Sequence, residues 1–172
     1  LWGAYIVSYG KLSAMELLGL TLSIGISSNV LGLSAAHELA HRVNRKFEPL
    51  LSKILYFTVL YIHFGIEHVV GHHKRVATPE DPATARIGES FYTFLPRTIF
   101  GGFNSAWEFE AKRMKGQKKP IWSIENPMIA ALLAQTAFAI LIGMVFGWIG
   151  IFYLFAQSFV AIILLENANY IV

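Results

Sequence analysis

The sequence contains no cysteine among its 172 residues. Without thiols, this stretch cannot form a disulfide, ligate an iron–sulfur cluster, hold a haem through a thiolate or build a cysteine-rich zinc site. Histidine and carboxylate side chains are the metal ligands that remain.

Charged residues are also scarce. They make up 15% of the chain, against about 25% in soluble domains, while apolar residues reach 55% and the mean hydropathy is +0.50. This balance favours a membrane protein over a soluble domain. Both ends of the chain, Leu1 and Val172, fall in or beside apolar stretches, so we expect a piece of a longer protein.

Positive charge is confined to one part of the chain. The formal net charge is +3, and every Lys and Arg except Lys11 lies between Arg42 and Lys119. A basic segment flanked by apolar stretches is the positive-inside pattern of a membrane protein. We therefore expect membrane lipid around the chain, no nucleic-acid partner, and a cytoplasmic location for the basic segment.

The apolar segments have lengths that suit membrane crossings, which take about 20 residues each. The last of them runs from 128 to 165, which is too long for one crossing, and a Gly-Trp-Ile-Gly turn at its middle predicts a hairpin. The predicted spans are 12–36, 128–147 and 149–168, with the tail of a preceding span at 1–7.

Two further segments are predicted not to cross. Residues 50–66 are at the short limit for a span and contain Lys53 and His63, so we expect one buried or interfacial helix. Residues 74–127 are polar and predict a cytoplasmic region with short helices, one of them over 103–114. The fold class that follows is all-α: an integral-membrane helical bundle with a cytoplasmic histidine-box metal site.

Five of the six histidines are concentrated in two short boxes, HELAH at 37–41 and EHVVGHH at 67–73. On a helix, side chains at i and i+4 share a face, and imidazole is the commonest protein metal ligand. A catalytic zinc takes three protein ligands. Five exceed that need, so we expect two metal ions, and nitrogen ligands suit iron, copper, nickel or zinc. The predicted metal ligands are His37, His41, His68, His72 and His73.

Histidine ligands usually need a partner that orients the other ring nitrogen. Glu38, Glu67 and Asp81 are the nearest candidates in sequence, whereas His63 has no partner at metal-binding spacing and is predicted to pack within its helix. Two other functions stay open. The first box alone matches a zinc protease with Glu38 as the general base, and histidine pairs also occur in metal transporters.

The boxes and the motifs that follow them closely resemble the integral-membrane non-haem di-iron alkane hydroxylases (alkane 1-monooxygenases). The resemblance covers essentially the whole chain in order. The motifs after the boxes are TPEDPA at 78–83, GESFY at 88–92, Ala106-Trp107, Glu110, Trp122-Ser123 and LENANY at 165–170.

The resemblance implies that the five box histidines are ligands of two non-haem iron ions. It also implies further histidines beyond the Asn-Tyr pair at 169–170, and Val172 stands where the family usually has Glu. The implied reaction is insertion of one oxygen atom of O2 into a terminal C–H bond of a medium- or long-chain alkane. Electrons would come from rubredoxin and its NAD(P)H-dependent reductase, at a bacterial inner membrane.

Related enzymes remain alternatives to the alkane hydroxylases. These are the hydroxylases of xylene and other alkylbenzene side chains and the fatty-acyl desaturases and hydroxylases. Three residues separate His68 from the His72-His73 pair, which favours the alkane hydroxylases. The basic run at 112–119 could help to dock an acidic electron carrier, although we interpret it as ordinary positive-inside charge.

Overall fold

The computed structural model describes residues 1–42, 45 and 47–171, and these residues form helices and no strand. The predicted all-α class is therefore confirmed. The departure noted at Val172 lies outside the described residues. The helices are α1 (Trp2–Tyr9), α2 (Ala14–Ser27), η1 (Ser28–Leu33), α3 (Ser34–Ala40), α4 (Phe47–Thr58), α5 (Ile62–Glu67), η2 (His68–His72), α6 (His73–Arg75), α7 (Phe91–Gly116) and α8 (Pro127–Ile171), where η marks a π-helix.

The first long apolar helix is formed by α2, η1 and α3 in succession, from Ala14 to Ala40. It begins at a capping box, in which the Glu16 backbone N–H donates to Ser13 Oγ and the Ser13 backbone N–H donates to Glu16 Oε2 at 2.8 Å. Its mean hydropathy reaches 1.5. With about 1.5 Å of rise per residue, it is long enough to cross a membrane.

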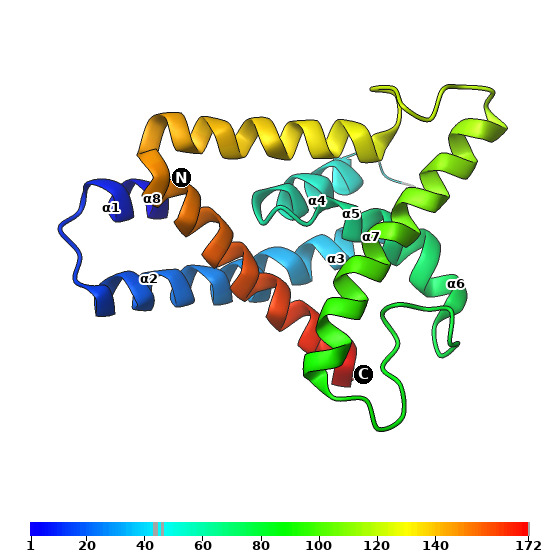
Figure 1. Ribbon diagram of the computed structural model, residues 1–172, viewed down its shortest axis with the longest axis horizontal. Helices are drawn as coiled ribbons and strands as arrows, with labels where there is room; N and C mark the ends of the chain where they lie inside the picture. Colours follow the sequence, from blue (N-terminus) through cyan, green and yellow to red (C-terminus); the bar gives the residue numbers. More distant parts are fainter. Residues whose placement is uncertain (43–44, 46, 172) are drawn as a thin grey trace.

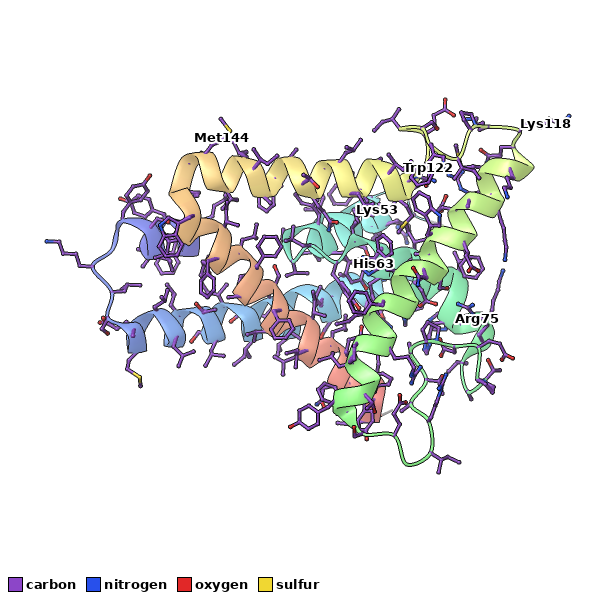
Figure 2. The ribbon with its side chains drawn as sticks, in the orientation of Figure 1. Lys53, His63, Arg75, Lys118, Trp122 and Met144 are labelled. Atoms are coloured by element: carbon purple, nitrogen blue, oxygen red, sulfur yellow. The ribbon has the colours of Figure 1, made fainter. Side chains whose placement is uncertain are left out.

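The second long apolar helix, α8, consists of two arms that meet at Gly147 (Figure 1). Gly147 has φ 70° and ψ −172°, a conformation open essentially to glycine alone. The mean hydropathy of α8 reaches 2.3, and the side chain of Met144 projects outward from the first arm (Figure 2). The bend falls within the turn predicted for the hairpin, and both long helices indicate a membrane protein.

The segment 50–66 is not the single helix that the sequence predicts. The helix α4 ends at Thr58, Leu60 adopts a left-handed φ of 57°, and α5 begins at Ile62. The break turns Tyr61 into the bundle, where its hydroxyl donates to Glu166 at 2.8 Å. The break at the end of α4 thus goes with a tertiary hydrogen bond, which the local pattern of apolar residues cannot reveal.

One buried cluster packs α3, α4 and α5 against the second arm of α8. Burying a large apolar side chain contributes about 1.5–3 kcal/mol, so this cluster is a major source of stability near the histidine boxes. Its members are Leu33, Ala36, Tyr56, Val59, Tyr61, Phe64, Ala161 and Leu165.

The region 74–127 contains one long helix in place of the predicted short ones. The helix α7 has 26 residues, and Ser90 caps its start by accepting from the Thr93 backbone N–H. Figure 1 shows α7 crossing the end of the bundle where α3, α5 and α6 meet, whereas the α8 bend and the α1–α2 turn lie at the opposite end. The fold thereby brings both histidine boxes to one end of the molecule.

Replacing Gly147 by Ala tests the hairpin bend. We expect Gly147→Ala to lower the free energy of unfolding by about 1–3 kcal/mol, because a Cβ is disfavoured at this backbone conformation. The control is Gly19→Ala, since a Cβ there meets nothing within 4 Å and α2 gains helix propensity. Thermal unfolding of the full-length protein in detergent measures both, and equal effects of the two substitutions would contradict the role of Gly147.

Candidate metal centre

Five histidine side chains converge where α3, η2 and α6 meet. His37 and His41 come from the end of α3, His68 and His72 from η2, and His73 from the start of α6. Ring centroids lie 4.4 Å apart for His37–His68, 4.7 Å for His41–His73 and 4.6 Å for His68–His73. The structure therefore gathers all five predicted ligands, although the two boxes are far apart in sequence.

Three of the five present nitrogen atoms closely enough to share one metal ion. One ring nitrogen each from His37, His41 and His68 lies within 4.8 Å of the others. His68 is buried, and burial together with neighbouring imidazoles, His37 first among them, lowers its pKa to about 3. A neutral imidazole with a free lone pair is the form that binds a metal.

The second box contains a π-helix, and this changes which of its histidines face each other. In a π-helix the backbone hydrogen bonds join residues i and i+5, whereas in an α-helix they join i and i+4. His68 and His73 are five residues apart, and their Nε2 atoms lie 3.1 Å from each other. His72, the expected i+4 partner of His68, has its ring stacked at 5.2 Å and its Nδ1 directed elsewhere. The expected i+4 neighbours are thus in ring contact, whereas the facing nitrogens belong to an i+5 pair that the sequence did not predict.

Asp81 orients His72. Nδ1 of His72 donates to Asp81 Oδ2 at 2.7 Å, which leaves Nε2 of the ring free for a metal. Asp81 is 1% exposed and also accepts from Thr84 Oγ1 and the Ala83 backbone N–H. The hydrogen bond to Asp81 raises the pKa of His72. Among the three candidate orienting carboxylates, Asp81 is the one that the structure joins to a ring nitrogen.

Glu67 braces the second box against α7 instead of orienting a ring. Its Oε1 accepts from Arg75 Nη2 at 3.0 Å and from Ser105 Oγ at 3.1 Å, and Arg75 also bonds Ser105. Figure 2 shows Arg75 on the side of the molecule where α6 faces α7. Burial raises the pKa of Glu67, although the Ser105 hydrogen bond opposes this shift. The group ties the residues on both sides of η2 to α7.

Glu38 lies at the surface. Its carboxylate pairs with Arg42 at 3.2 Å, and its side chain is 66% exposed. Within the described residues, no hydrogen bond joins Glu38 to a histidine. Its expected orienting role is thus replaced by an exposed ion pair, of a kind that contributes little to stability.

The site includes one carboxylate that was absent from the predicted set. Glu166, in the second arm of α8, is 1% exposed and accepts from Tyr61 Oη at 2.8 Å, Thr98 Oγ1 at 2.9 Å and Asn169 Nδ2 at 3.1 Å. The signal was an acidic residue within an apolar segment, because ionisable groups there are rare and generally paired. Glu166 ties α5 and α7 to α8 beside the metal centre.

His63 is packed, as its sequence context predicts. Its ring meets Tyr61 and Phe103 edge-on, at centroid distances of 4.7 and 5.3 Å. Its Nε2 is buried without a hydrogen-bond partner in the described part of the chain. Beside it lies a void of about 10 Å³ that Glu67 and Glu166 also line. A void of this size holds at most about one water molecule.

Replacing Gly71 by Ala tests the brace around Glu67. A Cβ at this position would lie 2.9 Å from both Arg75 Nη2 and Phe109 Cε2, and closer still to Glu67 Oε1. We expect a loss of about 1–3 kcal/mol of unfolding free energy from overpacking, measured by thermal unfolding of the full-length protein. Gly116→Ala is the control because a Cβ there meets nothing within 4 Å. A Gly71→Ala protein as stable as this control would contradict the close packing.

Comparison with known proteins identifies related chains. The profile of the fatty acid desaturase family matches residues 13–171. Alkane 1-monooxygenase of Acinetobacter baylyi is 42% identical over 170 residues, which are 99% of this chain and 41% of that protein. Alkane 1-monooxygenase 1 of Pseudomonas aeruginosa is 37% identical over 171 residues, which are 99% of this chain and 44% of that protein.

A third relative carries a different name. The hydroxylase component of the xylene/toluene monooxygenase of Pseudomonas putida is 29% identical over 131 residues, 70% of this chain and 33% of that protein. The chain spans about two fifths of the length of the two alkane 1-monooxygenases. These relatives confirm the predicted resemblance. Since the matched range takes in both histidine boxes and nearly every described helix, the chain belongs to the fatty acid desaturase family.

Proposed function

We propose that this chain forms about half of the metal site of a membrane di-iron monooxygenase that converts alkanes to primary alcohols. The observation that carries the proposal is the convergence of five imidazoles from two distant boxes, next to the Asp81–His72 hydrogen bond. The proposed ligands are His37, His41, His68, His72 and His73. The names of the relatives supply the reaction class.

The donor set fits iron. Five imidazoles exceed the three protein ligands of a catalytic zinc, and nitrogen donors suit iron among the first-row metals. The facing Nε2 atoms of His68 and His73, 3.1 Å apart, cannot both carry hydrogen, so at least one lone pair is available. The further histidines that the resemblance implies would complete the coordination of two ions.

The zinc-protease alternative fits the geometry less well. In that mechanism the glutamate of the first box acts as general base and must face the metal-bound water. Here the Glu38 carboxylate pairs with Arg42 at the surface. A protease site would also leave the three histidines of the second box without a role.

The proposed reaction balances as R–CH3 + O2 + 2 e⁻ + 2 H⁺ → R–CH2OH + H2O. When bound, the two irons supply the activation of O2. The described residues hold the ligands in position: Asp81 holds the His72 ring with its Nε2 free, and Glu67 with Arg75 holds η2 against α7.

An apolar cavity of about 490 Å³ lies beside the second box. Alkyl-chain ligands bind in pockets of about this size, which are mostly apolar. The cavity lies between α4, α5, η2 and the first arm of α8, and residues of both boxes, Ala40 and Val69, line it. Its lining includes Tyr56, Ile62, Ile66, Val69, Ala131 and Ala134. We assign it to the alkane chain.

The orientation and the electron donor belong to the same proposal. The basic residues between Arg42 and Lys119 follow the positive-inside pattern, and the fold places both boxes at the end where α7 lies. The metal site would therefore face the cytoplasm of a bacterial inner membrane. Rubredoxin, reduced by its NAD(P)H-dependent reductase, would deliver the two electrons from that side.

The test uses the full-length protein in membranes or detergent. We expect about two irons per chain and, with octane and ¹⁸O2, a primary alcohol that contains one labelled oxygen atom. His73→Ala should remove iron and activity, because it deletes a ligand that faces His68. His63→Gln is the control and should retain its iron, since His63 lies outside the cluster of ligands.

Three results would contradict the proposal in different ways. One zinc per chain, unaffected by His72→Ala and His73→Ala, would indicate the protease. Oxidation of xylene methyl groups with no alkane turnover would indicate the alkylbenzene hydroxylases. Conversion of fatty acyl chains to alkenes, without insertion of oxygen, would indicate a desaturase.

A further inference from the structure

The loop that carries Asp81 lies between α6 and α7 and has no helix or strand of its own. Turn hydrogen bonds shape it locally, such as those from the Asp81 backbone N–H to Thr78 O and from the Glu89 backbone N–H to Arg86 O. Such bonds do not fix a loop relative to the rest of a protein. The position of the Asp81 carboxylate therefore depends on what anchors the loop to the helices.

Arg97, in the second turn of α7, anchors this loop at three of its residues. Nη1 donates to Pro82 O at 2.9 Å, and Nη2 donates to Thr84 O at 3.0 Å. Nε and Nη2 also bind the two carboxylate oxygens of Glu89, at 2.8 and 2.5 Å. Two of these acceptors lie one and three residues after Asp81. The planar fork of a guanidinium is suited to such a set of acceptors.

Two further contacts hold Arg97 and its partner in place. The guanidinium lies over the Phe94 ring, 5.3 Å from its centroid. Tyr170 Oη, at the end of α8, donates to the Glu89 backbone carbonyl at 2.6 Å. The hydrogen bond from Arg97 lowers the pKa of Glu89 to about 2, so the pair stays ionised at neutral pH. The anchor thus joins the loop to α7 and to α8.

The same face of α7 approaches the loop closely one turn later. A Cβ built on Gly101 would lie 2.8 Å from Pro82 Cβ, the residue directly after Asp81. At the neighbouring Gly102, the nearest atom would be Glu67 Cγ at 3.9 Å, an ordinary van der Waals contact. Gly101 therefore allows the loop to rest against α7, whereas Gly102 has room for a side chain.

We propose that Arg97 is a positioning residue of the metal centre: by clamping the 78–90 loop to α7, it places Asp81 against Nδ1 of His72. Among the described residues, Arg97 donates hydrogen bonds to Pro82, Thr84 and Glu89 and to none of the proposed ligands. It acts through Asp81, whose hydrogen bond to Nδ1 of His72 sets the ring orientation and leaves Nε2 free for a metal. The inference rests on the proposed ligand role of His72 and adds to that proposal the part of the fold that sets the ligand's orientation.

A double-mutant cycle in the full-length protein tests the coupling. The measured quantity is the affinity for Fe(II), or for Co(II) as a spectroscopic substitute, by anaerobic titration. Loss of an orienting partner typically lowers metal affinity about 10–100-fold, and we expect this for Asp81→Asn. We expect Arg97→Lys to lower it by a smaller factor, up to about 10-fold, because lysine cannot bind the four acceptors as a fork.

The cycle distinguishes positioning from a general structural role. If Arg97 acts through Asp81, the Asp81→Asn, Arg97→Lys double variant should bind no more weakly than Asp81→Asn alone. Full additivity of the two effects would overturn the proposal, and so would wild-type affinity in Arg97→Lys. Arg113→Lys is the matched control, since the Arg113 side chain is 41% exposed and pairs with Glu110 on the same helix; the metal affinity of this variant should be unchanged.

A second perturbation leaves every charge in place and covers the case in which Arg97→Lys fails to fold. Gly101→Ala should displace Pro82 and lower metal affinity, while Gly102→Ala should bind as the wild type does. Equal affinities of the two alanine variants would overturn the clamp. The measured quantity is metal affinity, so the test of Arg97 does not depend on alkane turnover. A negative result for Arg97 is therefore distinguishable from a negative result for the proposed reaction.

Discussion

Three carboxylates, Glu67, Asp81 and Glu166, lie almost fully buried at the histidine end of this apolar bundle. A buried charge costs several kcal/mol unless it is paired and hydrogen-bonded. Each carboxylate accepts from at least two donors, and the donors come from different helices or from the loop before α7. The hydrogen bonds to these carboxylates therefore fix the positions of helices relative to one another, which non-directional hydrophobic packing alone would not do.

The histidine cluster follows from those connections. Glu67 with Arg75 and Ser105 connects η2 and α6 to α7. Glu166 connects α5 and α7 to α8. Asp81 orients the His72 ring. Between these anchors the second box forms a π-helix, which brings His68 and His73 face to face. π-helical segments often occur at functional sites, and here the wider repeat aligns two proposed ligands.

The family match covers both histidine boxes: the first long apolar helix carries one box, and η2 with the start of α6 carries the other, at the same end of the molecule. The proposed alkane hydroxylation needs three things from the protein: a nitrogen-rich metal site, an apolar pocket and a path for electrons. The described residues supply five imidazoles and a cavity of about 490 Å³. The electron path remains part of the proposal and depends on the charge distribution.

The sequence by itself determined the helical class, the apolar segments, the Gly147 turn and the five histidines. These features depend on local properties: the hydropathy of a segment, the backbone freedom of glycine and the spacing of histidines along the chain. Tertiary structure decided the rest. The break at Leu60, the burial of Glu166 and the contacts of Arg97 all depend on partners outside their own segments. The i+5 pairing of His68 and His73 also escaped prediction, because an α-helical repeat was assumed where the packed chain forms a π-helix.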